Sequence, residues 1–420
     1  MARFREVLKN RDFFFLWLGQ IISQFGERLA QMALIGLVYM RSPGSTIQLA
    51  KILSLTILPV FLIGPVAGVY VDRWDRRRTM FVCDFLRSFF VWLIPLFLIL
   101  QRPLSLIYIL IFIIFSVGRF FIPAKLSIVP YLVRKENLLI ANSLVNTTAM
   151  IAAILGFGIG GLIVEWLGVK GGFCLNAAGF FISGMLIFFI SQRKAPYLKI
   201  RQVGREIVEV ISKSVIQEIK EGVVYFIKQK NVRFTGAIMF FLGGALGAIY
   251  IVIIVFVQKM LPSGQSGTKE LGLIIMFLGI GLFLGSLLYG RFGHRLSHFK
   301  AIFSSLIISG LVLAIFVLGL TYYPYLLLAA GLAFILGLAV SPVIITCNTL
   351  IHKSSQNEMM GRVFSSIDFL LHFSFILFMF LSSFLAERIP SNIILIVVAC
   401  LFIVLGVFNL IFQRKIPWLN

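Results

Sequence analysis

Four polar side chains recur along an apolar segment at residues 13–40. Gln20, Gln24, Glu27 and Gln31 are spaced by four, three and four residues, which places them on one face of a helix. Arg28 borders this face, about 100° around the helix axis. A charge at the centre of a membrane helix costs about 2.5–3.5 kcal/mol, which disfavours a lipid-facing position. We expect this face to line an aqueous cavity, where Glu27 binds a proton or a cationic substrate; the alternative is a structural ion pair with an arginine of another helix.

A second polar face is predicted near the carboxyl end of the chain. Ser365, Asp368 and His372 are spaced by three and four residues, so Asp368 and His372 can hydrogen-bond on one helix face. A histidine beside a carboxylate can titrate near physiological pH. The pair is therefore a candidate second proton site, and the alternative is a structural polar contact between two parts of the chain.

Three further charges fall within apolar runs. Arg119 is expected one turn inside a helix, where it neutralises Glu27 or an anionic substrate, or extends its long side chain to the membrane interface. Asp84 and Arg87 are three residues apart and are expected to support a neighbouring basic loop. His294 and His298 have the i,i+4 spacing of metal ligands but no third ligand nearby, and the sequence has no P-loop for nucleotide phosphates, so we expect no metal and no cofactor.

The composition explains why these charges stand out. Of 420 residues, 60% are hydrophobic and 13% are charged, whereas soluble chains carry about 25% charged residues. This excludes a soluble globular enzyme, a disordered chain and a secreted disulfide scaffold. Apolar runs long enough to cross a membrane predict an all-α membrane protein with twelve transmembrane helices at 13–40, 49–71, 79–100, 104–123, 141–165, 173–191, 234–258, 271–290, 301–321, 324–345, 361–385 and 391–412.

The distribution of basic residues predicts the orientation of these helices. With a cytoplasmic amino terminus, 28 of the 38 lysines and arginines fall in inner segments, 7 in outer segments and 3 inside apolar runs. This bias predicts a multi-pass inner-membrane protein with both termini in the cytoplasm. The net charge of +22 is therefore attributed to orientation and to contact with anionic lipids, and no nucleic-acid partner is expected.

Matching features on the two sides of a charged central segment indicate a parallel repeat. Lys9 recurs as Lys230 and Glu136 as Glu358, at offsets of 221 and 222 residues. We predict a six-helix half at 1–191, a cytoplasmic linker with an amphipathic helix at 192–233, and a second six-helix half at 234–420. Two such halves imply a substrate site between them near the membrane midplane.

The loop after the second apolar run carries a patterned set of glycine, acidic and basic residues, namely Gly68, Asp72, Arg73, Asp75, Arg76 and Arg77. Its spacing resembles the loop signature GxxxDRxxRR of the major facilitator superfamily. The resemblance implies a fold of two six-helix halves, in which this loop latches the halves in the outward-facing state. The alternative is a basic loop that sets orientation and has no switching role.

Further segments resemble the macrolide-efflux and enterobactin-exporter branch of that superfamily, at 10–27, at 123–144 and at 361–365, where Gly361 and Arg362 are assigned to gating. The resemblance implies a monomeric secondary transporter that exports a small amphipathic molecule, such as a drug, macrolide or siderophore, by proton antiport, with membrane lipids as its surroundings. The segment 156–161 keeps its glycines but lacks the proline of the antiporter motif. The alternatives are a lysophospholipid transporter of the same fold and, from another class, a membrane-embedded enzyme or receptor.

Overall fold

The computed structural model describes residues 2–64, 67, 74–191, 230–261, 264, 266–293, 297–354 and 360–412, and every element in these ranges is a helix. The elements in chain order are α1 (Ala2–Lys9), α2 (Arg11–Arg41), α3 (Thr46–Leu62), α5 (Arg76–Ile99), α6 (Leu104–Leu132), the 3₁₀ turn η1 (Lys135–Asn137), α7 (Leu138–Phe188), α10 (Lys230–Met260), α11 (Lys269–Phe292), α12 (His298–Tyr322), α13 (Leu326–Ser354), α14 (Met360–Ala386) and α15 (Ser391–Phe412). The predicted all-α membrane fold is confirmed.

Among the described residues, nine helices are long and apolar enough to cross a membrane. The helix α2 has 31 residues but carries Glu27 and Arg28, and α3 has only 17 residues. Two predicted spans, 141–165 and 173–191, run together as α7, which kinks at Gly168 with φ 71° and ψ 171°. Glycine adopts this backbone conformation readily because it has no Cβ. The count of twelve spans stays a prediction.

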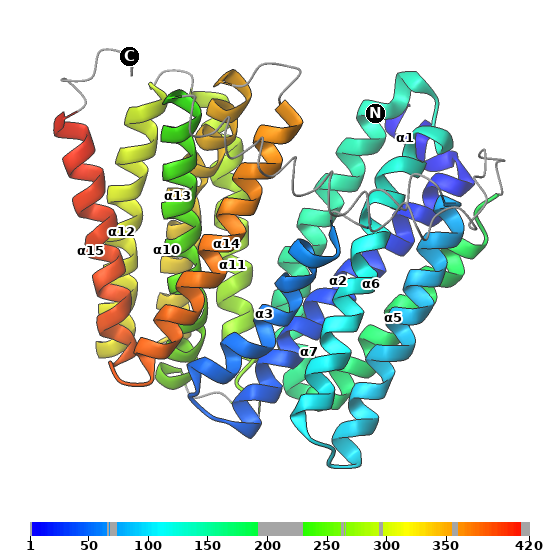
Figure 1. Cartoon of the computed structure of the whole chain (residues 1–420), viewed down its shortest axis with the longest axis horizontal. Helices are drawn as coiled ribbons and strands as arrows, with labels where there is room; N and C mark the ends of the chain where they lie inside the picture. Colours follow the sequence, from blue (N-terminus) through cyan, green and yellow to red (C-terminus); the bar gives the residue numbers. More distant parts are fainter. Residues whose placement is uncertain are drawn as a thin grey trace. The chain divides into compact units, whose positions relative to one another are not determined.

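The described residues belong to two compact units. The first comprises those within Met1–Arg41, Lys51–Lys213 and Gly264–Gly272, and the second comprises the remainder. In the first unit α7 packs against α2 and α5, and α5 packs against α6; in the second, α10 packs against α14, and α12 against α13 and α15 (Figure 1). The predicted boundaries at 191 and 234 stay a prediction, since residues 192–229, with the predicted amphipathic helix, lie outside the described residues.

A carboxylate in the second unit holds the start of α3. The Thr46 hydroxyl donates to the Ser383 carbonyl at 2.7 Å, and the Ser45 hydroxyl donates to Glu387 at 3.0 Å. The same carboxylate accepts the backbone N–H of Ile47 at 3.2 Å. Glu387 therefore satisfies an amide at the start of the helix, where negative charge is favoured.

The first unit contains the counterpart of this cluster at the start of α11. The Thr268 hydroxyl donates to the Gly161 carbonyl at 3.0 Å, and the Ser266 hydroxyl donates to Glu165 at 2.5 Å. The threonine, the glutamate and the residue that supplies the carbonyl each lie 222 residues from their counterparts in the second unit. This agrees with the offset of the predicted parallel repeat and gives the repeat a matching set of contacts.

Glycines allow α2 and α7 to approach closely. A Cβ atom at Gly156 would lie 2.8 Å from the Cβ of Arg28, and one at Gly26 would lie 2.7 Å from Oδ1 of Asn176. Real Cβ atoms do not approach other atoms so closely, so larger residues would push the helices apart. The close approach therefore fixes the positions from which the side chains of Arg28 and Asn176 extend from their helices.

The second unit offers a direct test of such packing. A methyl group at Gly247 of α10 would overlap the Phe375 carbonyl of α14, whereas one at Gly331 of α13 would meet nothing within 4 Å. We expect Gly247→Ala to lower the free energy of unfolding by about 1–3 kcal/mol through overpacking. Gly331→Ala is the matched control, and we expect it to be neutral or stabilising by up to about 1 kcal/mol. Thermal unfolding of the purified variants measures both, and equal melting temperatures would contradict the packing described.

Candidate binding cavity

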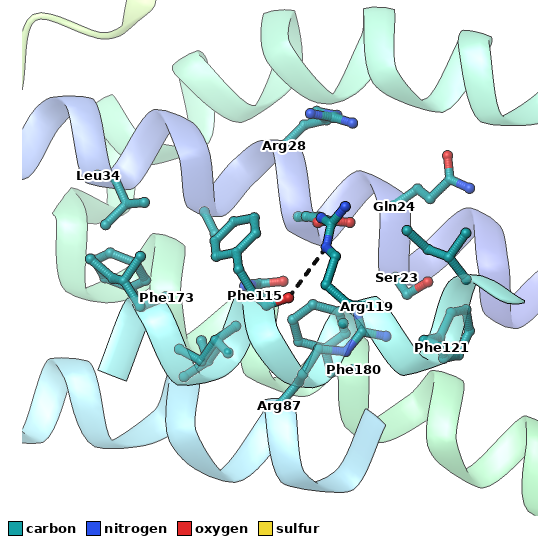
Figure 2. A pocket seen from close by; sticks show the side chains of 18 of the residues that line it. Ser23, Gln24, Arg28, Leu34, Arg87, Phe115, Arg119, Phe121, Phe173 and Phe180 are labelled. Atoms are coloured by element: carbon teal, nitrogen blue, oxygen red, sulfur yellow. Dashed lines mark hydrogen bonds between the residues drawn. The ribbon is translucent and has the colours of Figure 1, made fainter. Parts of the chain in front are cut away.

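A cavity of about 370 Å³ lies within the first unit, between α2, α5, α6 and α7. Figure 2 shows Ser23 and Gln24 extending from α2, Phe115, Arg119 and Phe121 from α6, Arg87 from α5, and Phe173 and Phe180 from α7. Much of its wall is aliphatic or aromatic, including Leu34, Ile94, Ile111, Ile114, Phe115 and Phe173. The remaining wall is polar and charged, so the cavity suits a molecule with both an apolar and a polar part.

The structure brings five of the predicted binding residues to this cavity: Gln20, Gln24, Glu27, Arg28 and Arg119. Gln31 does not line it and instead accepts a hydrogen bond from Arg28 Nη1 at 2.9 Å. Of the other predicted pair, the Asp368 side chain lies outside the described residues, and His372 is half-buried in α14 of the second unit, where it has an interaction partner. The helical spacing in α2 therefore predicted the polar face of this cavity.

Glu27 is the acidic residue of the cavity wall. Its carboxylate is half-buried and, among the residues that the structure describes, makes no hydrogen bond and no ion pair within 4.0 Å. Arg119 and Lys125 of α6 lie close enough to interact with it electrostatically. The carboxylate is therefore available to a proton or to a ligand.

Two cations of α6 face the same space. Arg119 Nε donates to the Phe115 carbonyl at 3.5 Å, and Figure 2 shows the side chain extending from α6 toward α2. Lys125 is half-buried and lines the cavity six residues later. The predicted span 104–123 ends two residues before Lys125. In the structure α6 continues through Pro123 and Pro130 to Leu132, and this continuation carries Lys125 into the cavity wall.

Arg87 and Asp84 form an ion pair in the wall of the cavity, with 5% and 0% of their surfaces exposed. Asp84 also accepts a hydrogen bond from the Ser183 hydroxyl at 2.6 Å, and the Arg87 guanidinium lies 4.2 Å from the ring centre of Phe180. The expectation that this pair supports the basic loop was wrong. The two residues lie on the buried face of α5, where each charge needs a partner because it is removed from water.

Two buried amides add hydrogen-bond acceptors to the wall. Gln20 and Asn176 are each 2% exposed, and the side-chain oxygen of each has no partner among the described residues. The Gln20 amide nitrogen donates to the Val145 carbonyl at 3.2 Å, which fixes this side chain between α2 and α7. Asn176 of α7 also lines the cavity. A buried acceptor without a donor favours a ligand or water molecule that donates to it.

The predicted gating residues lie elsewhere in the first unit or outside the described part of the chain. Gly68, Asp72 and Arg73 lie outside the described residues; Gly361 lies near the start of α14 in the second unit, and the side chain of its neighbour Arg362 is outside the described part of the chain. Asp75 caps α5 by accepting the backbone N–H of Arg78 at 2.6 Å. Arg76 lies over the ring of Tyr131, and Arg77 donates to the carbonyls of Ile187 and Phe188. These contacts tie the start of α5 to α6 and α7, and a latch role stays a prediction.

The sequence model of the Major Facilitator Superfamily matches residues 16–375. The chain belongs to this superfamily. A relative in the superfamily, the uncharacterized MFS-type transporter YkuC of Bacillus subtilis strain 168, is 28% identical over 392 residues, which cover 92% of this chain and 88% of YkuC. Macrolide efflux protein A of Streptococcus pyogenes is 23% identical over 388 residues, which cover 90% of each chain.

Solved structures of transporters have the same fold. The peptide transporter POT in complex with sulfate has a TM-score of 0.72 at 15% identity, covering 97% of this chain and 95% of POT. A bacterial homolog of the human lysosomal transporter Spinster, in an inward-facing and unoccupied conformation, has a TM-score of 0.68 at 13% identity and covers 96% of this chain and 97% of its own. At these identities the likeness shows the major facilitator fold alone.

Proposed function

We propose that this chain is a proton-coupled secondary transporter that exports a small amphipathic molecule across the inner membrane by alternating access. It acts as a monomer with both termini in the cytoplasm, and the cavity of the first unit forms part of its binding site. The observation that carries the proposal is the position of Glu27, an acidic side chain without a bonded partner among the described residues, in a cavity that is part apolar and part polar.

The two kinds of wall support an amphipathic substrate. Ile111, Ile114 and Phe173 offer apolar surface, while Gln20 and Asn176 offer hydrogen-bond acceptors. Burial of an apolar group contributes about 25 cal/mol for each Å² removed from water. The polar groups then fix the orientation of the bound molecule and its specificity.

Glu27 supports coupling to protons. A carboxylic acid inside a membrane protein changes charge when it binds a proton, and such residues commonly mark proton pathways. A ligand shifts a conformational equilibrium only by the difference in its affinity for the two states. Protonation of Glu27 must therefore favour one facing state. If the proton and the substrate favour different forms of the cavity, they are exchanged; if they favour the same form, they are transported together.

The outward direction is supported by the similarity to Macrolide efflux protein A over 90% of both chains. The excess of basic residues in the predicted inner segments supports the cytoplasmic termini.

A lipid-class transporter of the same fold is a second candidate, and a specific observation favours it. Arg119 and Lys125 together present cationic groups to the cavity, and such groups bind the phosphate of a lipid headgroup. Transport of soluble drugs or siderophores that lysophospholipid does not inhibit by competition would exclude this candidate.

Transport by purified protein tests the proposal. A thermal-shift screen against drugs, siderophores and lysophospholipids first selects a ligand, and proteoliposomes then measure its flux under an imposed pH gradient. We expect a steady-state concentration ratio of about tenfold for each pH unit with one coupled proton, and its loss on adding a protonophore. Flux of the selected ligand that is unchanged by both the gradient and the protonophore would contradict proton coupling. Protein-free vesicles serve as the blank.

A further inference from the structure

We infer that the cavity of the first unit binds an anionic group (a carboxylate, phosphate or sulfate) carried by an amphipathic molecule, and that Arg119 and Lys125 hold this group. The inference rests on the proposed function only in assigning the cavity to a transported substrate. Binding of the anion can be measured without transport, so the two proposals can fail separately.

The first support is the charge balance of the cavity. Arg28, Arg87, Arg119 and Lys125 line it, against Glu27 and the neighbouring Asp84, which leaves two positive charges in excess. Charges that are partly removed from water and surrounded by apolar walls interact more strongly than in bulk solvent. A cationic ligand would therefore be repelled from this space, and an anion would be attracted to it.

The second support is which cations remain available. Arg87 is bound to Asp84. Arg28 donates to Gln31 and lies 5.4 Å from the ring centre of Phe157.

Arg119 uses one nitrogen for a 3.5 Å hydrogen bond to a backbone carbonyl, and Lys125 makes no hydrogen bond or ion pair within the described part of the chain. The guanidinium of Arg119 keeps further N–H groups for a planar anion, and Lys125 adds a compact charge. Both side chains come from α6 and line the cavity, so they can hold the anion.

The third support is the neutral part of the wall. Gln20 and Asn176 each carry a buried amide oxygen without a partner among the described residues. The two residues give the wall a neutral polar part, while Ile94, Ile111 and Phe173 suit an apolar tail. The ligand class that fits all three surfaces is an amphipathic anion.

This ligand class determines the sign of coupling. The charged groups facing Glu27 are Arg28 on α2, Arg119 and Lys125 on α6, and Arg87 with Asp84 on α5. Ionised Glu27 repels a bound anion and attracts the same cations, so loss of its charge strengthens anion binding. By linkage the anion equally favours the protonated form of Glu27. Protonation of Glu27 and binding of the anion therefore strengthen each other in this cavity.

A matched pair of probes tests the inference. Octyl sulfate and octyltrimethylammonium have the same tail and fixed opposite charges, and their binding to the protein in nanodiscs can be measured by calorimetry against empty nanodiscs. We expect octyl sulfate to bind at least about tenfold more tightly. We also expect it to bind more tightly to Glu27→Gln than to the wild type, because the variant lacks the negative charge in the cavity wall.

Variants locate the site. We expect Arg119→Gln and Lys125→Gln each to weaken octyl sulfate binding about tenfold, and Arg119→Lys to retain most of it. Arg134→Gln and Lys135→Gln remove the same charges from exposed positions near the end of α6 and should leave binding unchanged. A monodisperse elution profile of each variant establishes that it is folded, and Arg119→Lys keeps the test informative if Arg119→Gln does not fold.

Tighter binding of the cationic probe would overturn the inference. Octyl sulfate binding that is unchanged by substitution of Arg119 and of Lys125 would also overturn it. If a proton gradient still drives a substrate through Glu27 in that case, the proposed function stands and only the ligand class falls. If the anion binds at these residues but no flux depends on protons, the ligand class stands and the proposed function falls. Competition by lysophosphatidylglycerol but not by octanoate assigns the anion to a lipid headgroup, and the reverse assigns it to a soluble metabolite.

Discussion

Glu27→Gln is expected to abolish transport driven by a pH gradient while leaving substrate movement down its own gradient in place. Glutamine has nearly the shape of glutamic acid and keeps its hydrogen-bonding capacity, but it cannot bind or release a proton. The wild type should sustain a substrate ratio of about tenfold for each pH unit of gradient, since one pH unit corresponds to about 1.4 kcal/mol per proton. In the variant we expect this ratio to fall to unity. Proteoliposomes with the gradient imposed in either direction measure it.

Two controls make this result specific. Glu27→Asp keeps a titratable group in the cavity and should retain part of the gradient-driven ratio. Glu136→Gln removes the same charge from an exposed position in η1 and should change nothing. Full gradient-driven accumulation by Glu27→Gln would remove Glu27 from the coupling role and leave His372 or another group to carry it.

Asp84→Ala is expected to have the largest effect on stability in the first unit. The variant leaves the Arg87 guanidinium, 5% exposed, without its anionic partner and leaves the Ser183 hydroxyl without its acceptor. Removing one partner of a buried ion pair costs about 3–5 kcal/mol because a charge remains buried and uncompensated. We expect a loss of that size in the free energy of unfolding of the purified protein, measured by thermal unfolding against the wild type.

A double replacement separates the charge effect from packing. Asp84→Leu combined with Arg87→Met removes both charges and keeps similar volumes, and we expect it to be far more stable than Asp84→Ala. Ser183→Ala removes only the hydrogen bond to Asp84 and should cost about 1–3 kcal/mol. Equal melting temperatures for Asp84→Ala and the double variant would mean that the pair contributes packing alone.

The α2 face of the cavity could be predicted from the sequence because helical periodicity is local. A spacing of three or four residues fixes which side chains share a face, and Gln20, Gln24 and Glu27 line one cavity as that spacing requires. Gln31 completes the pattern in the sequence but does not line the cavity, and it accepts a hydrogen bond from Arg28.

The α5 and α6 contributions were missed for reasons that depend on tertiary structure. The predicted end of a helix at Pro123 excluded Lys125, but proline inside a membrane helix is tolerated where neighbouring groups satisfy the freed carbonyl. Asp84 and Arg87 were expected to support a neighbouring loop because the sequence gives no measure of burial. In the folded first unit both residues are buried.

The exchange of short segments between the units was also beyond the sequence. The start of α3 belongs to the second unit and the start of α11 to the first. The repeat offset predicted equivalent positions but not their partners. Only the folded structure shows that Thr46 and Thr268 bind equivalent carbonyls.

Proton uptake on ligand binding tests the central claim most directly. Octyl sulfate has no titratable group near neutral pH, so any proton taken up when it binds in weakly buffered solution enters the protein. The account predicts net uptake by the wild type and none by Glu27→Gln at equal occupancy. Proton release by the wild type, or the same uptake by both proteins, would contradict the claim that Glu27 and the cations of α6 join proton and substrate in one cavity.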